Sequence, residues 1–264
     1  MTAIDSVIAH RSTINDKKTP QMTFEQTIKS NAPYHPVIPF DAGRDKLFVF
    51  DFTKNNKELS EELIADTDRF ANYINEKLYQ TKSRYGIGGY NEHRTLYARS
   101  KHFDSSSLAS TKIRTLEKDP AEQPAARRLH LGIDIWGPVG TKVMAPLDGI
   151  VHSFAFNNND GDYGATIILT HNLNGVSFHT LYGHLSLNSL KNLQAGIRIR
   201  RAEVFSEFGM RFENGNWPPH LHFQLIKDMQ GWEGDYPGVC NEKEKEKWLQ
   251  NCPDPNLVLG MEYS

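Results

Sequence analysis

The sequence predicts a mainly β protein with a helical N-terminal extension. From residue 128 onward, short apolar segments alternate with turn residues such as Gly and Asn, which is typical of antiparallel strands joined by hairpins. Before residue 104, apolar residues instead recur at helical spacing over 55–80. Short hairpin strands of this kind favour an antiparallel two-layer sheet with a groove.

Residues 1–103 are expected to form an N-terminal extension that packs on this groove. The segment DKLFVFDF at 45–52 predicts a first buried strand, and residues 55–80 predict an amphipathic helix, continuous or broken. In residues 84–103, tyrosine, arginine and histidine side chains cluster around a Gly-Gly turn. This cluster fits a groove wall and a polar edge hairpin equally well.

Three further regions complete the predicted organisation. Residues 104–126 are rich in Ser, then charged and Pro-containing, which indicates a mobile linker. Residues 127–230 form the predicted β domain. Residues 231–264 form a C-terminal tail, in which EKEKEKWLQ predicts a short helix that ends before two prolines.

Composition limits the possible partners and the cellular location. The chain has 264 residues and a formal net charge of −2, which argues against a general nucleic-acid binder. Its first twenty residues lack the apolar core of a signal peptide, and no stretch has the length of a membrane span. We therefore expect a cytoplasmic protein without a membrane partner, although export by another route stays open. The oligomeric state is not determined by the sequence.

The stretch RLHLGIDIW at 128–136 contains two candidate metal ligands, His130 and Asp134. Apolar and polar residues alternate here with the period of a strand, so His130 and Asp134 share one face. Four fully extended residues span roughly 13 Å, too far for both side chains to reach one ion. The strand is therefore predicted to bend between them, where Gly132 permits a bend.

A second stretch, NGNWPPHLHFQLI at 214–226, adds His220 and His222 on one strand face. Either pattern alone is most often an ordinary strand histidine beside a surface charge. Together they give two imidazoles, one carboxylate and a spare histidine, which is the composition of a catalytic zinc site with an open fourth position. In LYGHLS, His184 alternates on the same side as Tyr182, so both are predicted to face this groove.

Four motifs in order now resemble the LytM/lysostaphin-type zinc metallopeptidases over residues 126–226. They are H-x-G-x-D at 130–134, G-x-x-V-x-A-x-x-x-G-x-V at 140–151, Y-G-H-L-S at 182–186 and P-H-L-H-F at 219–223. The resemblance implies a small antiparallel β domain with zinc on the floor of a narrow groove, acting on peptidoglycan cross-links or glycine-rich peptides. It also implies zinc ligands His130, Asp134 and His222, and catalytic histidines His184 and His220, of which either can be the general base.

Departures from the family pattern bear on the substrate. Trp217 stands where a small residue is common, and it is expected to narrow the groove or offer a stacking surface together with Tyr97 and Tyr182. A closer resemblance covers more of the chain. Residues 85–99, the HLGIDIW and WPPHLHFQLI stretches and the trailing PDPNL are similar to metallopeptidase-like domains embedded in multidomain proteins that carry a class III aminotransferase. Under this resemblance, Arg94 is expected to bind a substrate carboxylate in an intracellular setting.

The leading hypothesis is therefore a zinc-dependent endopeptidase or amidase that cleaves a peptide or peptidoglycan-like amide bond. The alternative is a non-catalytic zinc-containing binding or regulatory module of intracellular metabolism. A cupin-like iron oxygenase fits the β-rich pattern and the H-x-H motif, but it does not explain His184. The sequence leaves open the bond cleaved and whether the N-terminal region blocks the groove.

Overall fold

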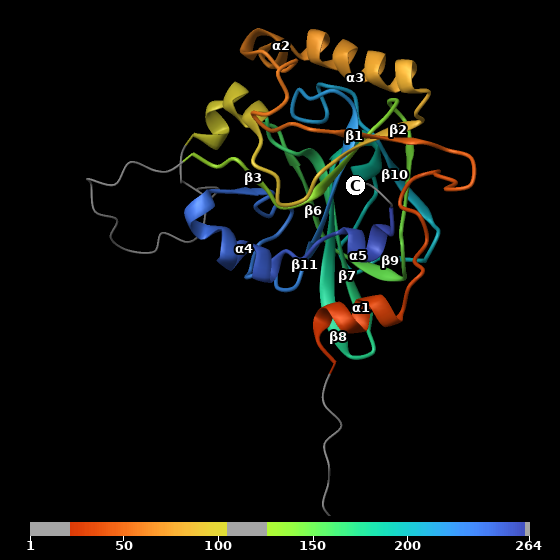
Figure 1. Cartoon of the computed structure of the whole chain (residues 1–264). Coiled ribbons are helices and arrows are strands. Elements are labelled where there is room, and N and C mark those ends of the chain that lie inside the picture. The colour runs from red at the N-terminus through yellow and green to blue at the C-terminus, as the bar shows by residue number, and fades with distance from the viewer. Residues whose placement is uncertain (1–21, 105–125, 262–264) are drawn as a thin grey trace, which may run out of the picture.

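The computed structural model describes residues 22–104 and 126–261, and an eight-stranded sheet runs through its centre (Figure 1). The strand order is β1-β2-β4-β11-β8-β7-β6-β9. The predicted β-rich fold class is confirmed. The bounds of these strands are β1 Leu47–Phe50, β2 Tyr85–Gly88, β4 Ile133–Trp136, β6 Gly149–Asn157, β7 Gly164–Leu173, β8 Val176–Leu185, β9 Arg198–Ile199 and β11 His220–Ile226.

Two short antiparallel pairs flank the large sheet. One joins β3 (Leu129–His130) to β12 (Val239–Cys240), and the other joins β5 (Lys142–Met144) to β10 (Val204–Glu207). The first pair brings His130 beside the C-terminal part of the chain. The polypeptide after residue 231 is therefore part of the surroundings of the predicted metal site.

The large sheet is mixed, whereas the sequence predicted an antiparallel one. Strands β1 and β2 are parallel, and β2 then pairs antiparallel with β4. Parallel neighbours need a long crossover connection, and helices α2 (Glu61–Ala65) and α3 (Thr67–Thr81) provide it. The N-terminal segment thus extends the sheet that carries Asp134. The predicted linker at 104–126 lies almost wholly outside the described residues.

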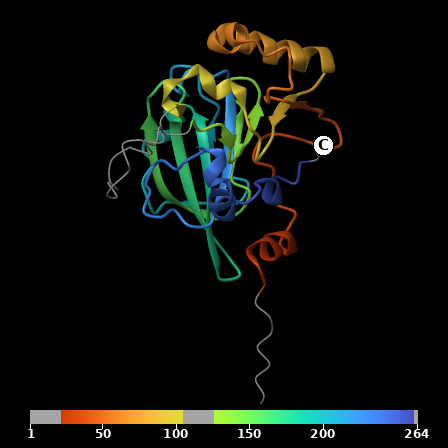
Figure 2. The same ribbon diagram turned by 60° about the vertical axis from the view of Figure 1, so that its left-hand side comes forward.

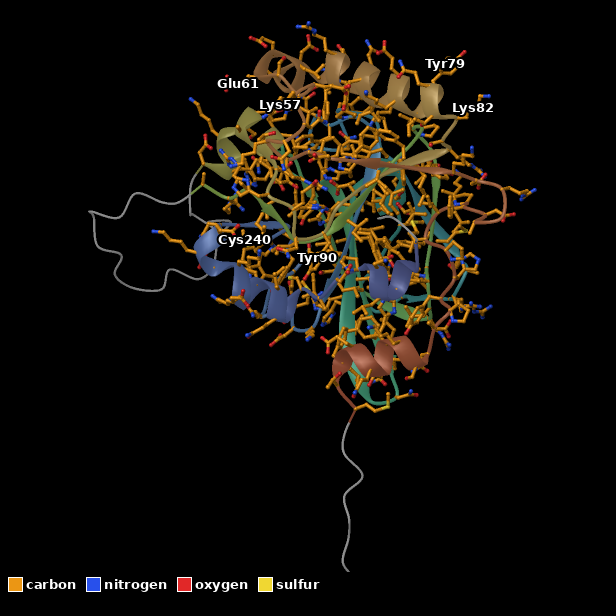
Figure 3. All side chains as sticks on the ribbon, viewed as in Figure 1. Lys57, Glu61, Tyr79, Lys82, Tyr90 and Cys240 are labelled. Carbon is orange, nitrogen blue, oxygen red and sulfur yellow. The ribbon has the colours of Figure 1, made fainter. Side chains whose placement is uncertain are left out.

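The helix predicted over 55–80 is broken at Asp66, whose side chain accepts hydrogen bonds from the backbone of Asp68 and Arg69 and so caps α3. Helix α1 (Phe24–Ser30) was not predicted, because its seven residues are too few for a clear helical period. In Figures 1 and 2, α3 lies at one end of the molecule and α1 at the other. Figure 3 shows Tyr79 on the outer side of α3, where it is 86% exposed.

The C-terminal helices α4 (Lys245–Asn251) and α5 (Asn256–Leu259) complete the fold, and α4 confirms the short helix predicted in the tail. No helix within residues 22–104 and 126–261 is long and apolar enough to cross a membrane.

An aromatic cluster joins the helical crossover to the central strand β4. The rings of Phe52 and Phe70 lie edge-on against Trp136, with centroids 5.6 and 5.9 Å away. All three side chains are buried. Since Trp136 is two residues from Asp134, this cluster ties the N-terminal layer to the strand that carries a predicted ligand.

Replacing Phe52 with Ala is expected to lower the free energy of unfolding by about 3–5 kcal/mol, because it opens a cavity in this cluster. Chemical denaturation measures the change. Val49→Ala is the control, since Val49 lies on β1 and is 43% exposed. A loss below about 1 kcal/mol for Phe52→Ala would contradict the role of the cluster.

Candidate metal centre

Three predicted ligands meet at one point. Nε2 of His130 lies 3.0 Å from Nδ1 of His222 and 3.3 Å from Oδ1 of Asp134. Nδ1 of His222 lies 3.1 Å from Oδ1 of Asp134. Ligand atoms placed tetrahedrally around zinc at its usual bond lengths are about 3.3 Å from one another. All three residues are buried, and their ligand atoms form a group able to hold one metal ion.

Strand pairing creates this meeting point. His222 on β11 is the direct cross-strand neighbour of Asp134 on β4. The predicted bend is present, because β3 ends at His130 and β4 begins at Ile133. Gly132 matters there for space: a Cβ atom at this position would lie 2.5 Å from Cε1 and Nε2 of His222. The glycine thus admits the ligand ring to the bend.

Hydrogen bonds from the far side orient both ligand imidazoles. His130 donates from Nδ1 to the carbonyl of Gly89 at 3.0 Å, and His222 donates from Nε2 to Oε1 of Gln224 at 2.9 Å. Gln224 is fixed in turn by donating to the carbonyl of Pro237 at 3.1 Å. Burial lowers the pKa of His130 to about 4, so the imidazole is neutral and presents a lone pair to the centre.

Asp134 is held as a carboxylate. Burial alone would raise its pKa, but the neighbouring guanidinium of Arg94 holds the pKa of this carboxyl well below its usual value. Oδ2 accepts a short hydrogen bond from Nη1 of Arg94. Oδ1 faces the two imidazoles, so the carboxylate divides its oxygens between a cation and the metal position.

The residues fit zinc by donor type. Two nitrogens and one oxygen form the donor set of many catalytic zinc sites, and each imidazole has the outer hydrogen bond that such ligands usually make. The site therefore provides three protein ligands and leaves a position toward the adjoining cavity.

A cavity of about 750 Å³ opens beside this centre, and Asp134, His220 and His222 are part of its wall. One side is formed by residues 96, 97 and 99–103, which belong to the segment 84–103. Other parts of the wall come from residues within 157–163 and within 232–239, two segments far apart in the sequence. The wall residues used below are Tyr97, Arg99, Arg127, Trp136, Tyr163, His184 and Trp217.

His184 and His220 lie next to the metal position, with ring centroids 4.1 Å apart. His184 donates from Nδ1 to the carbonyl of Asn214 and His220 donates from Nδ1 to that of Pro218, both at 2.8 Å. Each ring thus keeps Nε2 available. Burial lowers the pKa of His220 to about 4 and the pKa of His184 well below its usual value, so both are neutral. Trp136 stacks on His220 at 3.9 Å.

The prediction that Tyr182 faces the groove is wrong. His184 adopts a left-handed conformation with φ of 63°, and the β7–β8 register shifts at this point. A bulge of this kind interrupts the alternation of side chains, so Tyr182 and His184 point to opposite faces. Tyr182 is fully buried in the core and packs on Phe205 and Phe223.

Arg94 also differs from its predicted role. Its side chain is 0% exposed and is paired with Asp134 and Glu92, a geometry that does not fit contact with a substrate carboxylate. Tyr97 and Trp217 do line the cavity, each largely buried. The guanidinium of Arg99 covers Trp217, 4.6 Å from the ring. The contact of Tyr97 and Trp217 with substrate stays a prediction.

Several residues at the centre were not predicted from the sequence. Glu92 and the carbonyl of Gly89 come from the N-terminal segment, and neither belongs to a recognisable motif. Tyr163 lies in a loop, and its hydroxyl is 3.4 Å from Nε2 of His222. Gln224 was given no role at the centre, although its position two residues after His222 on one strand indicates a shared face.

Gly132→Ala is expected to displace His222, because the new methyl group meets the ligand ring and the carbonyl of Phe223. Bound zinc, measured by elemental analysis, should fall well below one ion per chain. Gly43→Ala is the control, since Gly43 lies in an exposed loop. Full zinc occupancy in folded Gly132→Ala would contradict the assigned geometry.

Comparison with known proteins agrees with this centre. Residues 128–234 match the sequence profile of Peptidase family M23. The chain is 39% identical over 97 residues to the "DD-carboxypeptidase/endopeptidase Mpg" of Neisseria meningitidis serogroup B, covering 37% of this chain and 20% of that protein. An "Uncharacterized metalloprotease" of Haemophilus influenzae is 33% identical over 98 residues, covering 37% and 18%. This chain thus spans about a fifth of the curated relatives it matches.

The similarity to solved structures is weaker. The lysostaphin catalytic domain from Staphylococcus simulans is 24% identical, with a TM-score of 0.33 over 46% of this chain and 80% of that one. A zinc-containing peptidase from Vibrio cholerae is 24% identical, with a TM-score of 0.30 over 44% and 32%. The closer resemblance to aminotransferase-linked domains stays a prediction. Residues 128–234 are thus similar to Peptidase family M23, and the His-Asp-His centre lies within this region, which supports a zinc-dependent metallopeptidase.

Proposed function

We propose that this chain is a zinc-dependent hydrolase that cleaves a peptide or peptidoglycan-like amide bond. The observation that carries the proposal is the convergence of His130, Asp134 and His222 beside two further neutral histidines at a cavity wall. When bound, zinc supplies a Lewis acid that polarises the amide carbonyl and makes water more acidic.

The chain's own residues handle protons and developing charge. With Nδ1 engaged, Nε2 of His184 or His220 is free to accept the proton of the attacking water. The imidazole that takes this proton can then donate from Nε2 to the oxyanion and pass the same proton to the leaving amine. Trp136 fixes the plane of His220 by stacking, which limits its motion during these transfers.

A substrate rich in hydrogen-bond acceptors suits the cavity wall. Among the described residues, several buried nitrogen donors of this wall have no acceptor: Arg99 Nη1, Arg127 Nε, Trp136 Nε1 and Trp217 Nε1. Buried donors are normally paired, and peptide carbonyls or a terminal carboxylate would pair them. The name of the Neisseria relatives, DD-carboxypeptidase/endopeptidase, supports a peptidoglycan-type peptide. The cytoplasmic location stays a prediction.

His184→Ala and His220→Ala are expected to keep zinc but to lose about 10²–10⁴-fold in kcat, because each removes a proton-transfer group. Cleavage of peptidoglycan fragments and of short synthetic peptides, with zinc content measured in parallel, tests this. His152→Ala is the control, since His152 is half-buried and bonds to Ser153 away from the centre. Zinc-loaded protein that cleaves none of these substrates would instead favour the non-catalytic binding module.

Arg127→Gln is expected to raise KM for peptides with a free terminal carboxylate by about tenfold or more, since a hydrogen bond to a charged group contributes about 1.5–3 kcal/mol. The same peptides with an amidated terminus should show little change. Arg128→Gln is a matched control, because the neighbouring guanidinium pairs with Asp104. Equal effects on free and amidated peptides would exclude carboxylate binding by Arg127.

A further inference from the structure

We propose that Arg94 is a positioning residue that confines Asp134 to binding zinc through a single oxygen, and thereby keeps a coordination position open for substrate. Arg94 lies outside the family match at 128–234, so the N-terminal segment supplies a working part of the metal centre. The inference rests on the metal site and does not depend on which bond is cleaved.

The guanidinium of Arg94 is fixed in one orientation. Nε donates to Oε2 of Glu92 at 2.6 Å, Nη1 donates to Oδ2 of Asp134, and Nη2 donates to the carbonyl of Gly89 at 3.2 Å. Every nitrogen of the group therefore has an acceptor. With the side chain fully buried, rotation would leave several donors unpaired at a large cost.

The surrounding residues are shaped around this group. A Cβ atom on Gly88 would lie 2.7 Å from Nη2 of Arg94, so a glycine is needed for the guanidinium to fit. The ring of Phe52 lies 5.3 Å from the guanidinium carbon, within the range of a cation–π contact. The carbonyl of Gly89 accepts from Arg94 and also from the ligand His130. The turn at Gly89 thus orients both Arg94 and the metal ligand His130.

Asp134 has two oxygens, and carboxylates can bind metal ions through one or both. Oδ2 is engaged by Arg94, while Oδ1 points to the ligand nitrogens of His130 and His222. A charge-assisted hydrogen bond of this type is strong, so Oδ2 is withheld from the metal. A catalytic zinc site keeps one position for water or substrate, and a second carboxylate oxygen would add a further ligand that crowds this position.

The charge balance allows a cation beside Arg94. Glu92 and Asp134 contribute two negative charges against the single positive charge of Arg94. The charges of these three side chains therefore sum to −1. Arg94 can therefore orient Asp134 without making the centre repel zinc.

The test uses the full chain loaded with Co²⁺ in place of zinc, because four-coordinate Co²⁺ absorbs visible light more strongly than five- or six-coordinate Co²⁺. Arg94→Met is expected to lose visible absorption, since the released Oδ2 raises the coordination number. Arg84→Met is the matched control: Arg84 belongs to the same segment and pairs with Asp45, but its side chain is 48% exposed. Its absorption should equal that of the unmodified protein.

Glu92→Gln provides a second variant that keeps the hydrogen bond from the backbone of Phe52 to Oε1. It removes the charge that anchors Nε of Arg94, so a smaller loss of absorption in the same direction is expected. Where zinc-loaded protein cleaves peptide, Arg94→Met should lower kcat about 10–100-fold with little change in KM.

Unchanged Co²⁺ absorption in folded Arg94→Met would overturn the proposal. If Arg94→Met does not fold, Arg94→Lys and Glu92→Gln decide: lost absorption supports the proposal, and unchanged absorption in both overturns it. The spectrum is recorded without substrate, so its outcome is independent of whether the chain proves to be a peptidase.

Discussion

The pairing of β4 with β11 is the constraint on which the metal centre depends. It places Asp134 directly opposite His222, so two ligands from distant parts of the sequence become neighbours in one sheet. The bend at residues 131–132 then brings His130 back toward them. Strands β4 and β11 are buried on both faces. This burial fixes the register of their pairing, because a slip by one residue would send every ligand to the opposite face.

Much of this centre could be predicted because its ligands obey the period of a strand. His220 and His222 share a face by spacing alone, and the bend between His130 and Asp134 follows from the length of an extended chain. Tyr182 shows where this reasoning stops. The bulge at His184 depends on tertiary hydrogen bonds to Tyr163 and Gly209, which local sequence does not display, and the bulge reverses the expected direction of Tyr182.

The N-terminal segment illustrates a second limit. A strand at 45–52 and a helix, continuous or broken, over 55–80 were predicted from apolar spacing, but the parallel pairing of β1 with β2 was not. Likewise, the density of polar side chains at 84–103 indicated a special role without revealing which side chains face the cavity. Arg94 is buried just before the 3-10 helix at Thr95–Arg99, whereas Tyr97 and Arg99 within that helix line the wall.

The position of β2 has a consequence for how the chain can be divided. Strand β4 lies between β2 and β11, so a fragment cut at the limits of the family match would leave one side of β4 without a partner. Unpaired backbone groups on an apolar strand are a template for association with other chains. The region that matches Peptidase family M23 is thus narrower than the unit that folds with a protected sheet edge, and aggregation of a trimmed domain would reflect an exposed strand.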